Sequence, residues 1–328
     1  MSKITHPSTI FCLMVMALTG MSQSESPVIS LIIDPTIPEN FSNDQLEEMN
    51  SDLVSMINVI APDPRNYNYS LSLVQDVSLA DRLFLAQLGF GPKVELAISG
   101  KNSNEMLSTR SYEEQKAILE RSKEIVEAAK ICGENEIIVR GFMPQSFDQN
   151  EDTYKALDEL GILYNMGFQA GILYAPGHED DVWPYKVEKH EFYAVPISTI
   201  EFSGEKVPLD DRFLKDKGIS ASQYYDLLTG KLDEILSKDE PMVVSLSTSV
   251  SGKGDYLDEF KRFIDYAEAK GAKFVKSYEL IEMKFPGIIE ETESTCTTCD
   301  KTADSQTYGD QTTNETMNNS MNQTYIVG

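Results

Sequence analysis

The sequence predicts an α/β fold in which helices join parallel strands, arranged as a (β/α) barrel. Short apolar runs alternate with segments of helical periodicity from Val28 to about Pro286, which is typical of parallel strands with helical crossovers. The alternative is an open doubly wound sheet, in which a glycine-rich phosphate loop is common. Neither G-x-G-x-x-G nor G-x-x-x-x-G-K-[ST] occurs in the chain, so the barrel is favoured. Functional groups in such a barrel lie on loops at the carboxyl ends of strands.

The candidate strands are the short apolar runs of this region. They are Val28–Ile33, Tyr69–Val74, Val94–Ile98, Glu136–Arg140, Phe192–Ile197, Met242–Ser247 and Lys273–Val275.

Helices between these runs have recognisable ends. The segments Ser42–Gln45 and Ser111–Glu114 are capping boxes, in which a hydroxyl and a side chain three residues later satisfy free backbone N–H groups. Residues Tyr256–Lys270 place their apolar side chains on one face, and Gly271 is expected to end that helix.

The N-terminus predicts export. Lys3 gives a weakly basic start, Thr9–Leu18 form a short apolar core, and small residues follow at positions 20, 22 and 24. We interpret residues 1–24 as a signal peptide and expect an extracellular or cell-surface protein. The alternative is a buried N-terminal helix. No later stretch is long and apolar enough to span a membrane.

The C-terminal segment, residues 287–328, is expected to be a disordered tail. Of the 39 residues from 290 to 328, 20 are Ser, Thr, Asn or Gln, and such a composition cannot offset its own ordering entropy. N-x-[ST] sequons, which accept N-linked glycans in exported proteins, occur in the tail and in the body. They are at Asn314, Asn318, Asn322, Asn40 and Asn68.

Cysteine usage suggests no catalytic role. Cys296 and Cys299 form an isolated C-x-x-C without a nearby histidine, which is a poor zinc site and, after export, a candidate for a local disulfide. Cys132 is expected to be a buried apolar residue.

The charge restricts the partners. The chain carries 53 acidic and 28 basic side chains and a net charge of −25, which repels nucleic acid and anionic membrane surfaces.

Four segments in order resemble the polysaccharide deacetylase (NodB homology) family. They are RGFMPQSFDQNEDTYKALDEL at Arg140–Leu160, the strand, loop and helix of Val94–Ala128, LIIDPT at Leu31–Thr36, and MVVSLSTS at Met242–Ser249 followed by KFVKSYELI. The resemblance covers about residues 28 to 286. It implies a distorted (β/α) barrel and removal of acetyl groups from glycans.

The resemblance also implies a site that this chain has altered. Family members hold a divalent metal with one Asp and two His, and they use a second Asp as base and a late His as acid. Asp34 falls on the base, but the metal ligands fall on Pro35, Ser99 and Ser103, and the acid falls on Ser247. We therefore expect no metal and no other cofactor.

Two further site predictions concern Arg140 and a second metal site. The segment Arg140–Leu160 resembles the family's third motif, a loop that contains an arginine. That arginine falls on Arg140, or is replaced by Met143. In the enzyme alternative, zinc would bind at His178, Glu179, Asp180 and Asp181, although consecutive loop carboxylates are usually solvated.

Aromatic residues near the predicted strand ends are candidates for stacking on sugar rings. They are Phe142, Phe147, Tyr174, Trp183 and Tyr185. The alternative for Phe142 and Phe147 is packing of the barrel rim.

These observations leave three hypotheses. The first is a secreted, metal-free, non-catalytic protein that binds a cell-envelope glycan. The second is an active deacetylase with a metal near His178, and the third is an extracellular scaffold or adhesion protein. Loss of every metal ligand favours the first and third, since sites rather than folds carry chemistry.

Overall fold

The computed structural model describes residues 26–62, 65–80, 93–128 and 137–288. The predicted signal peptide, the cysteines 132, 296 and 299, the tail sequons and nearly all of the predicted tail lie outside these residues. No helix in the described ranges is long and apolar enough to cross a membrane.

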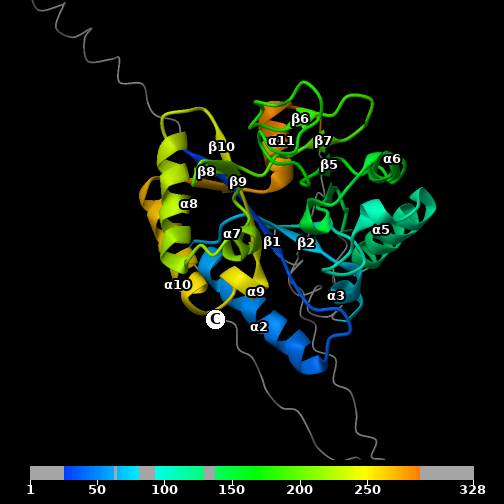
Figure 1. Cartoon of the computed structure of the whole chain (residues 1–328), viewed down its shortest axis with the longest axis horizontal. Helices are drawn as coiled ribbons and strands as arrows, with labels where there is room; N and C mark the ends of the chain where they lie inside the picture. The colour runs from blue at the N-terminus through cyan, green and yellow to red at the C-terminus, as the bar shows by residue number, and fades with distance from the viewer. Residues whose placement is uncertain (1–25, 63–64, 81–92, 129–136, 289–328) are drawn as a thin grey trace, which may run out of the picture. The chain divides into compact units, whose positions relative to one another are not determined.

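One curled, barrel-like sheet organises the described chain (Figure 1). Its strands are β1 (Val28–Asp34), β2 (Tyr69–Leu73), β3 (Val94–Ile98), β4 (Gly141–Phe142), β5 (Tyr164–Asn165), β6 (Tyr185–Lys186), β7 (Tyr193–Ala194), β10 (Pro241–Ser247) and β11 (Lys273–Val275). Their order is β10-β1-β2-β3-β4-β5-β7-β6, and β11 also pairs with β1. All of these pairings are parallel except that between β6 and β7. The predicted α/β barrel class is confirmed.

Helices follow most of the strands, and the longest of these helices cover the outside of the sheet (Figure 1). The helices are α2 (Asn43–Ile60), α3 (Gln75–Ala80), α5 (Tyr112–Glu127), α6 (Glu151–Glu159), α7 (Asp211–Asp216), α8 (Ala221–Ile235), α9 (Thr248–Ser251), α10 (Gly254–Ala269) and α11 (Ser277–Lys284), with short 3-10 turns at Leu107–Thr109 and Gln145–Phe147. A separate hairpin is formed by β8 (Thr199–Phe202) and β9 (Glu205–Pro208). The longest of these helices, α2, α5, α8 and α10, each bury an apolar stripe.

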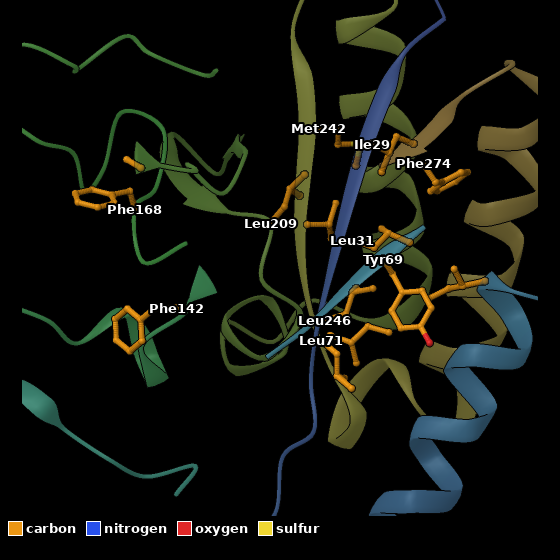
Figure 2. Close-up of a cluster of buried hydrophobic side chains, with 14 of the residues drawn as sticks. Ile29, Leu31, Tyr69, Leu71, Phe142, Phe168, Leu209, Met242, Leu246 and Phe274 are labelled. Carbon is orange, nitrogen blue, oxygen red and sulfur yellow. The ribbon is translucent and has the colours of Figure 1, made fainter. Parts of the chain in front are cut away.

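Both faces of β1 are buried, which explains its continuous apolar sequence. Ile29, Leu31 and Ile33 belong to the large cluster between the sheet and the helices. Ile32 belongs to the cluster inside the curl of the sheet. Figure 2 shows part of the large cluster, with side chains of β1 and β10 beside those of β2 and β11.

Most of the predicted local structure is confirmed. Ser42 and Ser111 each form a complete capping box. Helix α10 ends at Ala269 with Lys270 as its C-cap, directly before Gly271, whose φ of 73° is left-handed. The runs that begin at Val94 and Lys273 are strands with the predicted bounds. The runs that begin at Val28, Tyr69 and Met242 differ by one residue at one end.

The predicted strand Glu136–Arg140 is wrong in its described part. Residues 137–140 have no regular structure, and the strand is the two residues Gly141–Phe142. The predicted strand Phe192–Ile197 shortens to Tyr193–Ala194. Apolar periodicity cannot locate strands this short, because only pairing with neighbours defines them.

Gly141 allows β4 to approach β5 closely. A Cβ atom at this position would lie 2.2 Å from the ring of Tyr164, which is fully buried. We expect Gly141→Ala to lower the free energy of unfolding by about 1–3 kcal/mol, as overpacking does. Gly230→Ala is the control, because Gly230 is exposed in α8 with open space around it and alanine there should stabilise by about 0.5–1 kcal/mol. Denaturant unfolding of both variants measures the difference, and equal effects would contradict the argument.

Candidate functional site

A cluster of buried polar side chains lies at the carboxyl ends of the strands. Asp34 ends β1 directly opposite Ser247, which ends β10. Ser99 follows β3, and its N–H donates to the carbonyl of Leu73 at the end of β2. Asp34 is 1% exposed, and Ser99 and Ser247 are fully buried. The structure therefore brings Asp34, Ser99 and Ser247 together at one edge of the sheet.

Asp34 is paired with Arg212 and Gln145. Arg212 Nη1 lies 2.9 Å from Asp34 Oδ2, and Gln145 Nε2 donates to Asp34 Oδ1 at 3.3 Å. Gln145 also donates to Ser99 Oγ at 2.9 Å and accepts from Arg212 Nη1 at 3.2 Å. Burial raises the pKa of Asp34, and the Arg212 guanidinium offsets part of this increase.

The β8–β9 hairpin delivers Arg212 to this cluster. Its two-residue turn, Ser203–Gly204, has both φ angles positive, the type I′ geometry that suits a tight hairpin. Asp210 then caps α7: its Oδ1 accepts from Phe213 N at 2.9 Å, and its Oδ2 accepts from Ser245 Oγ at 2.7 Å. This second bond fixes the start of α7 against β10.

Asp211 ties the same helix to α9. Its Oδ2 accepts from the backbone N–H groups of Ser247 at 2.8 Å and Ser251 at 3.1 Å, and the residue is fully buried. Burial, together with the neighbouring Asp210 charge, raises the pKa of Asp211 to about 7. Asp211 therefore holds the site together rather than facing it.

Gln145 begins a strained turn. Ser146 and Phe147 have φ angles of 52° and 59°, a conformation that costs non-glycine residues energy and that is concentrated at functional sites. Ser146 is exposed, and Phe147 is half-buried against the inner cluster.

The residues at the family's metal positions do not form a metal site. Pro35 offers no side-chain donor, Ser99 Oγ is held by Gln145, and Ser103 Oγ accepts from Ile37 N at 3.1 Å. Neutral hydroxyls are poor zinc ligands. Ser247 Oγ, at the predicted acid position, shares hydrogen bonds with Thr36 Oγ1 at 2.8 Å and Ser249 Oγ at 2.7 Å.

Arg140 lies away from this cluster. It immediately precedes β4, and its guanidinium lies 5.8 Å from the ring centre of Tyr278 in α11. The predicted placement of Arg140 at the site is therefore wrong, and the guanidinium beside Asp34 comes from Arg212.

Three of the predicted sugar-stacking residues lack an available face at this edge. Phe142 is fully buried in the large apolar cluster (Figure 2), and Tyr185 is 5% exposed with its hydroxyl accepting from Ala175 N. Trp183 Nε1 donates to the Asp239 carbonyl just before β10, at the opposite end from Asp34. Phe147 beside Gln145 and Tyr174 on the loop after β5 remain candidates, with Tyr174 39% exposed.

The loop around His178 is organised by stacking. The His178 ring lies 3.9 Å from that of Tyr185, nearly parallel, and Nδ1 lies 2.6 Å from Asp181 Oδ2. Glu179 and Asp180 are exposed. No group of three or more His, Cys, Asp or Glu side chains suited to a metal occurs in the described ranges, so the predicted ligand set at residues 178–181 does not converge there.

Sequence reasoning missed Gln145 and the run Asp210–Arg212. A detectable signal existed, because Ser203–Gly204 between the strand-like runs TIEF and EKVP indicates a hairpin. An Asp-Asp-Arg run directly after it would then have been placed near a strand end.

Comparison with known proteins supports the fold. No protein-family profile and no curated protein matches the sequence. Among solved structures, a probable polysaccharide deacetylase from Pseudomonas aeruginosa PAO1 aligns with a TM-score of 0.60 and 14% identity, over 80% of this chain and 93% of that chain. The chain has a polysaccharide deacetylase fold.

Two further structures align equally well. One from Mycobacterium smegmatis, also assigned to the polysaccharide deacetylases, gives a TM-score of 0.59 and 14% identity over 79% of this chain and 92% of that chain. The Puue allantoinase aligns with a TM-score of 0.60 and 14% identity, over 81% of this chain and 93% of that chain. The deacetylase fold is thus shared by proteins with differently named activities, so the site must carry any functional assignment.

The buried ion pair predicts a large stability effect. We expect Arg212→Met to lower the free energy of unfolding by about 2–3 kcal/mol, because it leaves Asp34 buried without a charge partner. The expected loss is smaller than for a fully buried pair, because the Arg212 side chain is partly exposed. Arg121→Met is the control, because Arg121 and Glu124 form an exposed pair expected to contribute less than about 0.5 kcal/mol. Denaturant unfolding measures both, and a loss for Arg212→Met no larger than that of the control would exclude a stabilising pair.

Asp211 predicts that stability falls as pH rises. Its folded pKa of about 7 exceeds its ordinary value of 3.8, so between these values the native state binds more protons than the unfolded state. Stability should decrease from pH 5 to pH 8, and part of the decrease should disappear in Asp211→Asn, which keeps an oxygen acceptor. Thermal unfolding across this range tests it. A wild-type stability that rises with pH, or an unchanged slope in the variant, would refute this role.

Proposed function

We propose that this chain is a polysaccharide deacetylase-like protein that binds glycan at the carboxyl ends of its strands without metal-dependent catalysis. The observation that carries the proposal is the cluster in which Asp34, the retained base position, is paired with Arg212 and Gln145. The proposed location is the extracellular surface, after export by the N-terminal segment.

The donor set supports the absence of metal catalysis. A zinc ion needs nitrogen, sulfur or carboxylate ligands, but the three family positions carry a proline and two hydroxyls that already make hydrogen bonds. Asp34 alone cannot hold a catalytic ion, and its charge is already compensated by Arg212.

The composition of the edge supports glycan binding. Thr36, Ser249 and Arg212 are partly exposed around the buried cluster, and hydroxyl and guanidinium groups match the hydrogen-bonding groups of sugars. Phe147 supplies a half-buried ring beside them, and Tyr174 supplies an exposed one on the loop after β5. Polar groups that converge near aromatic faces are typical of small-ligand sites.

The enzyme alternative, a deacetylase using zinc near His178, has less support. The His178 ring is stacked on Tyr185, and only Asp181 lies within bonding distance among its acidic neighbours in the loop. The scaffold alternative predicts no ligand at this edge and is separated from the proposal by the binding experiment below.

Metal content tests the non-catalytic part. After dialysis, elemental analysis of the purified chain should find no stoichiometric zinc, cobalt or nickel, and N-acetylated oligosaccharides should release no acetate. About one metal per chain that is lost in Asp34→Asn would overturn the proposal, whereas loss in His178→Ala would favour the relocated site. Acetate release that a chelator abolishes would show an active deacetylase.

Ligand binding tests the second part. Titration of the protein with N-acetylated oligosaccharides, followed by ligand-detected NMR, should give binding that weakens roughly fivefold in Phe147→Ala or Tyr174→Ala, because one stacked ring contributes on the order of 1 kcal/mol. Trp183→Phe is the matched control, since Trp183 lies at the opposite end of the strands. Binding lost in the control, or no binding by wild-type protein to a broad glycan panel, would leave the scaffold hypothesis.

A further inference from the structure

We propose that Asn40 is an N-glycosylation site of the folded protein. The second sequon outside the tail, at Asn68, is inaccessible to a glycosylating enzyme once the chain is folded. This proposal concerns a covalent modification and does not depend on glycan binding at the strand ends. It follows from a comparison of two sequons that are equivalent in sequence but differ in their surroundings.

Asn40 presents its side chain to solvent. It lies in the loop between β1 and α2, is exposed together with Pro38 and Glu39, and has a left-handed φ of 57°. Asparagine tolerates this conformation better than most residues. The turn therefore leaves the acceptor amide accessible from solvent.

The other two residues of the sequon, Phe41 and Ser42, make contacts within the protein, and Ser42 stays exposed. Phe41 packs with Leu46 on a small apolar cluster, as residues on either side of a helix cap often do. Ser42 is exposed, and its Oγ accepts from Gln45 N at 3.3 Å. This capping bond uses a lone pair of the oxygen, so the Ser42 hydroxyl proton stays available for recognition.

Asn68 has the opposite environment. Its Nδ2 donates to both carboxylate oxygens of Glu279, at 3.2 and 2.9 Å. Its partner hydroxyl, on Ser70, is fully buried in β2 and bonds to Glu95 Oε2 at 3.0 Å. Asn68 is half-buried with its amide held by Glu279, and an enzyme could reach the fully buried Ser70 hydroxyl only if β2 and α11 separated.

The expected reaction uses an oligosaccharide linked to a lipid phosphate. Asn40 Nδ2 forms a bond to C1 of the first sugar and loses one proton, while the bond from C1 to the phosphate oxygen breaks. The lipid phosphate leaves with that electron pair, so no oxidant or reductant is required.

The modification would place carbohydrate on the loop that follows Asp34, close to the candidate site. Asn40 belongs to the loop that begins at Asp34, and Ile37 of this loop donates to Ser103 at the edge of the cluster. A glycan on Asn40 would therefore stand at the rim of the candidate site.

The test uses the purified, folded full-length chain, a purified oligosaccharyltransferase and its lipid-linked oligosaccharide. Peptide mass spectrometry after the reaction maps each sequon separately, including those of the tail. We expect at least tenfold higher occupancy at Asn40 than at Asn68 in the folded protein. After denaturation, Asn68 should become modified to a similar extent. Equal occupancy of the two in the folded chain, or no modification at Asn40, would overturn the proposal.

Matched variants separate the sequon from the helix cap. Ser42→Thr keeps the sequon hydroxyl and the helix cap, and Asn40 should remain modified in this variant. Ser42→Asp keeps a capping side chain but lacks the hydroxyl, and Asn40 should no longer be modified. Asn40→Asp preserves a residue that tolerates a left-handed φ and should lose modification at this position only. Circular dichroism confirms that each variant is folded, and continued modification of folded Ser42→Asp at Asn40 would contradict the assigned role of Ser42.

Discussion

The arrangement at the carboxyl ends of the strands depends on the buried charge of Asp34. A carboxylate that is 1% exposed must have a charge partner or hydrogen bonds, since an unpaired buried charge is strongly unfavourable. Arg212 supplies the charge, and Gln145 supplies a hydrogen bond while also binding Ser99. These contacts join β1, the turn after β4 and the start of α7, so one electrostatic requirement fixes three separate parts of the chain.

The same requirement explains why hydroxyl groups are suited to this edge. With Arg212 already balancing Asp34, further charged side chains would need partners of their own. The serine hydroxyls find neutral partners instead: Ser99 accepts from Gln145, Ser103 accepts from the Ile37 N–H, and Ser247 shares a hydrogen bond with Ser249. Such an edge offers hydrogen bonds but no set of strong metal ligands. It is consistent with recognition of an uncharged, hydroxyl-rich ligand, which a strongly acidic protein would not repel.

The two ends of the strands have different roles in the fold. Away from the Asp34 cluster, Arg140 lies near Tyr278, and Trp183 is held by the Asp239 carbonyl just before β10. The aromatic residues predicted to stack on sugars therefore differ in position. Phe142 and Tyr185 are buried in the core, Phe147 lies in the turn that begins at Gln145, and Tyr174 is exposed on the loop after β5.

The sequence by itself determined the α/β class, the principal long strands, the helix caps at Ser42 and Ser111 and the stop at Gly271. Each of these depends on residues within one turn or one strand. The resemblance to the polysaccharide deacetylases also implied a common site for Asp34, Ser99 and Ser247, and the structure places all three at the carboxyl ends of parallel strands. Only the tertiary structure decided that Arg212, rather than Arg140, pairs with Asp34, and that Gln145 bridges them. Gln145 meets Asp34 across 111 residues and Arg212 across 67, and such contacts are set by the relative positions of whole elements, which local patterns do not encode.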